Sequence, residues 1–312
     1  MIPRTTTVLR STFSSSALVF VVLILFGVPS AAWAGDPDDA SLTVYAVNYP
    51  LTYFAQRIAG SHANVVFPAP ADEDPAFWNP DPETIAAFQK ANLILLNGAG
   101  YARWAYKASL PRWKVLDTSA GFKEQYIKIE EAVTHSHGAE GKHAHEDVAF
   151  TTWIDFDLAA RQARAIGEAL SRMRPDLQDE LQSNYVMLAK DLKDIDKAIQ
   201  EIVSANPTKP LIGSHPVYDY FARRYGLTMK SVHWEPDEVT SEAQWAELQG
   251  ILKEHPAKWM IWEGEPMQGS VDKLEAAGIK SFVFDPCGNV PDQGDFLGVM
   301  RQNVKNLKKA FP

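Results

Sequence analysis

A long amphipathic segment near the middle of the chain constrains the fold more than any other feature. It runs from Pro175 to Asn206-Pro207, and prolines at both limits are typical of the boundaries of a helix. Apolar residues recur in it at alternating spacings of four and three, which places them on one face of an α-helix. About thirty residues at 1.5 Å each predict a rod of roughly 45 Å. The apolar positions are Leu181, Tyr185, Leu188, Leu192, Ile195, Ile199 and Ile202.

On both sides of this segment, short β-rich runs alternate with helical runs. Such alternation is typical of βα units with a parallel sheet. We therefore predict an α/β fold, with two lobes of parallel-rich βα sheets joined by one long rigid helix. A core helix within one larger domain is the alternative. The expected strands are 42–47, 64–67, 93–97 and 113–116 before the helix, and 211–214, 229–233, 259–262 and 281–284 after it.

The N-terminal residues 1–34 are typical of a secretory signal peptide. Arg4 and Arg10 precede the apolar run 17–28, and Ala32 and Ala34 are the small residues of a cleavage site. The apolar run is too short to span a membrane. We expect cleavage near Ala34, export to a bacterial periplasm, and no lipid attachment, because no cysteine stands directly after the run.

The remaining residues divide, by this interpretation, into an N-terminal lobe at 35–174, the linking helix at 175–206 and a C-terminal lobe at 207–312. Without the two leader arginines, the chain has 28 Lys and Arg residues and 39 Asp and Glu residues, which gives a net charge of −11. That charge argues against nucleic acid as a partner and is compatible with cations. Cys287 is the single cysteine, so an internal disulfide is excluded. We expect a monomer.

A histidine-rich stretch at 134–147 interrupts the first lobe. It holds four of the chain's eight histidines and almost no apolar residue, so we expect a loop. Imidazoles are common ligands of Zn²⁺, so the loop indicates transition-metal handling, with a plain solvated loop as the alternative. The four histidines are His135, His137, His143 and His145.

Several polar side chains follow expected strands, where parallel sheets bind their ligands. His215 follows the strand 211–214 and Asp285 follows the strand 281–284, so a nitrogen and an oxygen ligand could converge on one metal. Glu263 and Glu265 follow the strand 259–262 and could add a carboxylate to the same cleft or face solvent. Asp155 precedes a helix and is better interpreted as its cap.

Tryptophans also stand at expected strand and loop ends, where they belong to the core or line a pocket for something larger than an ion. They are Trp78, Trp153, Trp234 and Trp262. No catalytic motif for nucleophilic, phosphate or dinucleotide chemistry appears, so we do not expect an enzyme.

Taken together, these features resemble the zinc and manganese solute-binding proteins of bacterial ABC transporters, over essentially the whole mature chain. The most specific match is Gly213-Ser214-His215 followed by 220–227, supported by Phe284-Asp285-Pro286. The resemblance implies a periplasmic receptor that captures a divalent metal between its lobes and delivers it to an inner-membrane permease.

The resemblance also implies a shell of three histidines and one carboxylate, which this chain matches only in part. His215 takes the place of the third histidine and Asp285 that of the carboxylate. Ala76, after Asp74-Pro75, and Thr151, before Trp153, stand where the other two histidines are expected. Glu265, Asp74 or the loop histidines would then have to complete the shell.

Three hypotheses follow. The first is a divergent receptor for a divalent metal, zinc favoured over manganese, which uses His215 and Asp285 together with loop histidines or a nearby carboxylate. The residues expected to line its cleft are Asp74, Trp78, Thr151, Trp153, Trp234 and Glu263. A second is a receptor on the same scaffold that binds a metal chelate or small organic solute against the tryptophans. In a third, a periplasmic metal chaperone holds the ion in its histidine-rich loop.

Overall fold

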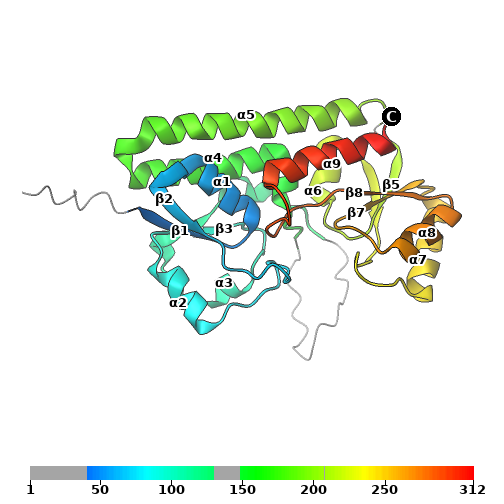
Figure 1. Cartoon of the computed structure of the whole chain (residues 1–312), viewed down its shortest axis with the longest axis horizontal. Coiled ribbons are helices and arrows are strands. Elements are labelled where there is room, and N and C mark those ends of the chain that lie inside the picture. The colour runs from blue at the N-terminus through cyan, green and yellow to red at the C-terminus, as the bar shows by residue number, and fades with distance from the viewer. Residues whose placement is uncertain (1–40, 130–147, 207) are drawn as a thin grey trace, which may run out of the picture. The chain divides into compact units, whose positions relative to one another are not determined.

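The computed structural model describes residues 41–129, 148–206 and 208–312. From Ser41 to Pro312 the chain forms one compact unit. It has the predicted α/β architecture, with two parallel sheets, helices around them and a long helix running past both (Figure 1). The signal peptide and the histidine-rich loop predicted from the sequence lie outside the described residues.

The first lobe is built on a four-stranded parallel sheet in the order β2-β1-β3-β4. Asn48, Asp81 and Asp155 accept backbone N–H groups at the starts of three of its helices, so the interpretation of Asp155 as a cap is confirmed. The elements are β1 (Leu42–Ala46), α1 (Tyr49–Ala59), β2 (Ala63–Val66), α2 (Pro82–Lys90), β3 (Leu93–Leu96), α3 (Trp104–Lys107), β4 (Val115–Asp117) and α4 (Phe156–Met173).

The second lobe repeats this topology, with a parallel sheet in the order β6-β5-β7-β8. Ser241 and Gln244 form a capping box at the start of its first long helix. The elements are β5 (Pro210–Gly213), α6 (Asp219–Tyr225), β6 (Thr228–Ser231), α7 (Glu242–Glu254), β7 (Trp259–Trp262), α8 (Gln268–Ala276), β8 (Lys280–Val283) and α9 (Phe296–Ala310).

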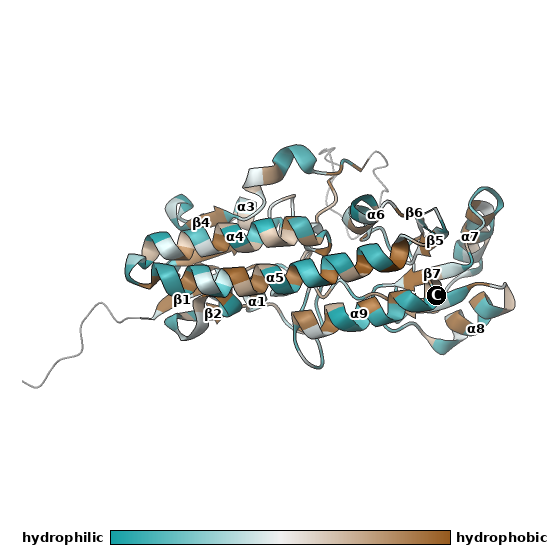
Figure 2. Ribbon diagram, turned by 90° about the horizontal axis from the view of Figure 1, so that it is seen from above, coloured by the Kyte–Doolittle hydropathy of each residue, from teal (hydrophilic) through white to brown (hydrophobic). Residues whose placement is uncertain are grey.

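Helix α5 (Gln178–Val203) is the predicted connecting helix. It contacts α1 and α4 of the first lobe and α6 and α9 of the second, and Figure 2 shows α4, α5 and α9 running alongside one another. It is shorter than predicted because Pro175–Leu177 forms a separate 3₁₀ turn. Its 26 residues span roughly 39 Å. Five of the predicted apolar positions are buried: Leu181, Leu188, Leu192, Ile195 and Ile199.

One hydrophobic core continues from the first sheet, along α5 and α9, to one face of the second sheet. A smaller cluster around Trp234, Trp245 and Trp262 fills the other face. Ion pairs of Arg57 with Asp191 at 2.8 Å and of Arg224 with Asp196 at 2.7 Å tie α5 to α1 and α6. No helix in the described ranges combines the length and apolar composition that a membrane crossing requires.

Candidate metal centre

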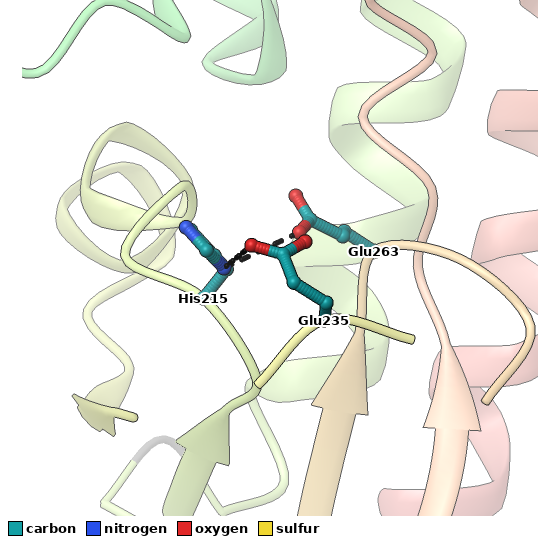
Figure 3. Close-up of side chains that lie close together, drawn as sticks. All are labelled: His215, Glu235 and Glu263. Carbon is teal, nitrogen blue, oxygen red and sulfur yellow. Dashed lines mark ion pairs between the residues drawn. The ribbon is translucent and has the colours of Figure 1, made fainter. Parts of the chain in front are cut away.

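Three side chains converge where the strand order of the second sheet reverses. The reversal lies between β5 and β7, and ligands of open parallel sheets bind at such points, beyond the carboxyl ends of the strands. His215 follows β5, Glu263 follows β7, and Glu235 follows β6. Figure 3 shows their side chains pointing toward one another. One ligand atom from each lies within 4.8 Å of the others.

The separations within this group suit a metal ion better than direct hydrogen bonds. The Nδ1 atom of His215 lies 3.5 Å from Oε1 of Glu263 and 3.7 Å from Oε1 of Glu235. Hydrogen bonds between such atoms are about 2.7–3.2 Å long. Ligand atoms at about 2.1 Å from a tetrahedral ion lie roughly 3.4 Å apart, which is close to the observed separations. The three groups can therefore hold one divalent cation.

The electrostatics of the group favour a cation as well. Burial, followed by repulsion from Glu235, Asp74 and Asp285, raises the pKa of Glu263 to about 8. Burial likewise raises the pKa of Asp285. Desolvation of the carboxyl group, together with repulsion from Glu235, raises the pKa of Asp74, although that residue is exposed overall. A bound cation would offset this repulsion.

Two of the predicted metal ligands, Glu265 and Asp285, lie outside the group formed by His215, Glu235 and Glu263. Glu265 is exposed, and with Asp285 it lines a cavity of about 780 Å³ between α8, β8 and α9. Repulsion from Asp285 contributes to the raised pKa of Glu263. The Oδ1 atom of Asp285 accepts the N–H of Cys287 at 2.6 Å. His135, His137, His143 and His145 lie outside the described residues.

Glu235 is the functional candidate that the sequence reasoning missed. The expected strand 229–233 ends two residues before it, so inspecting the end of every strand would have found it. Glu263, expected to line the cleft or add a carboxylate, belongs to the same group.

The predicted aromatic lining is mostly core. Trp153 is 1% exposed and its Nε1 donates to the carbonyl of Pro286 at 2.7 Å, while Trp234 is fully buried among tryptophans. Trp78 is half-buried, with its ring centroid 6.4 Å from that of Trp104. Thr151 is buried, and its hydroxyl donates to the carbonyl of Val217.

Comparison with known proteins agrees with this architecture. Among curated proteins, the zinc-binding lipoprotein AdcA of Streptococcus pneumoniae strain R6 is 26% identical over 290 residues, which cover 87% of this chain. The chain spans only 56% of the length of that relative. The high-affinity zinc uptake system protein ZnuA of Bacillus subtilis strain 168 is 25% identical, with 95% of each chain covered.

Solved structures share the fold. The metal-dependent lipoprotein YcdH of Bacillus subtilis has a TM-score of 0.73 at 23% identity, covering 86% of this chain and 98% of that one. Zn(II)-bound AdcA of Streptococcus pneumoniae has a TM-score of 0.72 at 22% identity, covering 87% of this chain and 58% of that one. The family model described as ZnuA, zinc-uptake complex component A, periplasmic, matches residues 44–310, nearly all of the described chain. The chain therefore belongs to this family of zinc-uptake components.

Proposed function

We propose that this chain is the extracytoplasmic receptor of a metal-importing ABC transporter. It captures a divalent transition metal, zinc favoured over manganese, in the cleft between its lobes and delivers it to a permease in the inner membrane. The observation that carries this proposal is the convergence of His215, Glu235 and Glu263 at separations that suit one ion.

The choice of metals rests on the relatives. AdcA and ZnuA carry zinc in their names, and a relative from Streptococcus gordonii is named as a manganese transporter component. An imidazole suits zinc, and carboxylates also suit manganese, so the mixed donor set accommodates both. In this proposal Asp285 and Asp74 add negative charge around the ion, and the loop histidines collect it.

The remaining parts of the proposal follow from the sequence. The chain is exported to the periplasm, and its signal peptide is cleaved near Ala34. The first lobe ends near residue 174, and the second begins near residue 207. The protein acts as a monomer and catalyses no reaction. A chelate or organic solute is a weaker candidate, because Trp153 and Trp234 are 1% and 0% exposed and cannot line a ligand pocket.

Calorimetric titration of the chelator-stripped mature protein with Zn²⁺ and Mn²⁺ tests the proposal. Loss of tight binding in His215→Ala supports the cleft site, while His62→Ala, which removes an imidazole paired with Glu180 at 3.1 Å, leaves binding unchanged. If tight metal binding is lost only when residues 136–144 are deleted, the loop holds the ion and the protein is a metal chaperone instead. If the intact protein takes up neither metal tightly, the receptor proposal is wrong.

A further inference from the structure

The short loop that carries His215 is fixed at both of its ends within the second lobe. At its start, the N–H of Ser214 donates to the carbonyl of Ile261 at 2.8 Å, which ties the loop to β7. At its end, the hydroxyl of Tyr218 donates to the carbonyl of Phe284 at 2.9 Å. The backbone between these two hydrogen bonds is short, so a contact to its middle affects the placement of the imidazole.

The middle of this loop is held from the first lobe, by Thr151. Its hydroxyl donates to the carbonyl of Val217, two residues after His215. Thr151 is 4% exposed, so this hydrogen bond lies away from water, where it is stronger than at the surface. Protein ligands of Zn²⁺ are thiolates, imidazoles and carboxylates, and a threonine offers none of these. Thr151 can therefore act on the site through the loop rather than on the ion itself.

Thr151 is itself held in a fixed place by a group of buried polar side chains in the first lobe. The carbonyl of the preceding residue, Phe150, accepts a side-chain N–H of Asn97 at 2.9 Å. The hydroxyl of the following residue, Thr152, donates to Oε1 of Gln162 at 3.2 Å. Asn97, Thr152 and Gln162 are fully buried. Because both of its neighbours are anchored, the first lobe determines where the Thr151 hydroxyl lies.

We infer that Thr151 is a positioning residue for His215, which it holds from the first lobe so that the imidazole stays against the two carboxylates (Figure 3). This inference rests on the proposed function. Glu235 and Glu263 follow strands of the second lobe, so loss of the Thr151 hydrogen bond displaces the nitrogen ligand and leaves the oxygen ligands in place. An imidazole suits zinc, whereas carboxylates suit manganese. Thr151 therefore favours zinc over manganese without contacting the ion.

Thr151→Val in the full mature protein removes the hydroxyl and keeps the branched shape of the side chain. We expect its Kd for Zn²⁺, measured by competition with a chelator, to rise about 10-fold, the lower end of the usual range for groups that orient a metal ligand. The Kd for Mn²⁺ should rise by a smaller factor, because the carboxylates stay in place. Thr151→Ser keeps the hydroxyl and should restore the Zn²⁺ affinity of the wild type.

Thr52→Val is the matched control. Thr52 is also 4% exposed, and its hydroxyl also donates to a backbone carbonyl, that of Asn48 at 2.9 Å, at the start of α1. Both substitutions remove one buried hydrogen bond, but the bond of Thr52 stays within the first lobe. Thr52→Val should therefore keep the wild-type Kd for both metals.

The place of the imidazole can also be followed in the metal-free protein. The rings of His215 and His233 meet edge to face, with their centroids 5.4 Å apart. The proton resonances of the His215 ring therefore report where it lies relative to the His233 ring. Thr151→Val should shift the resonance that His215→Ala removes, whereas Thr52→Val should leave that resonance in place.

The outcomes separate this inference from the proposed function. Wild-type protein that takes up neither metal overturns both. If the wild type binds Zn²⁺ tightly, an unchanged Kd or an unchanged His215 resonance in folded Thr151→Val overturns this inference alone. An equal loss of affinity for both metals, or a loss that Thr151→Ser fails to restore, also overturns this inference alone.

Discussion

Replacing Glu263 by Gln should stabilise the metal-free protein and weaken its response to metal. The Glu263 side chain is 24% exposed, and its pKa is raised from 4.5 to about 8 by burial and then by the neighbouring carboxylates. A carboxyl group whose pKa is raised on folding contributes full stability below pH 4.5, and that contribution is lost as the pH rises to about 8. Glutamine does not ionise, so the variant avoids this loss.

The magnitude follows from the same two pKa values. Each pH unit between them changes the free energy of unfolding by about 1.36 kcal/mol, so the difference between variant and wild type reaches roughly 3 kcal/mol at pH 7. Well below pH 4.5 the difference should vanish. For a chain of this size, roughly 3 kcal/mol corresponds to a rise in melting temperature on the order of 6 °C.

Urea unfolding in the presence of a chelator, at pH 5, 7 and 8.5, measures the effect. Glu265→Gln is the matched control, because Glu265 lies two residues away and is exposed, so its change should stay within about 0.5 kcal/mol at each pH. Added Zn²⁺ should raise the stability of the wild type more than that of Glu263→Gln. A variant no more stable than the wild type at pH 7 and 8.5 would refute the electrostatic reasoning.

Three further substitutions test the fold by urea unfolding. Gly98→Ala should destabilise by about 2–5 kcal/mol, because Gly98 has a φ of +77° and an added Cβ would lie 1.9 Å from Oγ of Ser119; a loss below 1 kcal/mol would contradict this geometry. Leu192→Ala should lower the free energy of unfolding by about 2–5 kcal/mol, since Leu192 is fully buried on α5. A loss as small as that of a typical surface substitution would mean that α5 is not part of the core. Asp155→Ala should cost about 1–2 kcal/mol through loss of the cap that accepts the N–H of Leu158, and Asp155→Asn should restore most of it.

Much of the fold could be predicted from local pattern. The spacing of Leu181, Leu188 and Leu192 on one helical face predicted α5, and the run at 259–262 matches β7 residue for residue. Such patterns work because each element must turn its apolar residues to one side. The boundaries were less predictable: Pro175 begins a separate 3₁₀ turn rather than α5 itself.

The candidate site was only partly predictable. His215 and Glu263 were named as candidates because the sequence places them after strands, yet Glu235 satisfies the same rule and was not named. Glu265 and Glu263 are two residues apart and look alike in the sequence, but one is exposed and the other lies beside His215. Which of them faces the site depends on the path of the loop after β7, and local pattern does not encode that path.

By itself, the sequence determined the alternation of strands and helices, the long connecting helix and a set of polar residues at strand ends, since all of these depend on near neighbours. Tertiary structure alone decided that β5 and β7 are adjacent, which brings His215 and Glu263 within 3.5 Å, and that Thr151 reaches Val217 in the other lobe. These contacts join residues 48 and 66 positions apart. Such pairings depend on strand order and loop paths, which only the packing of the whole chain fixes.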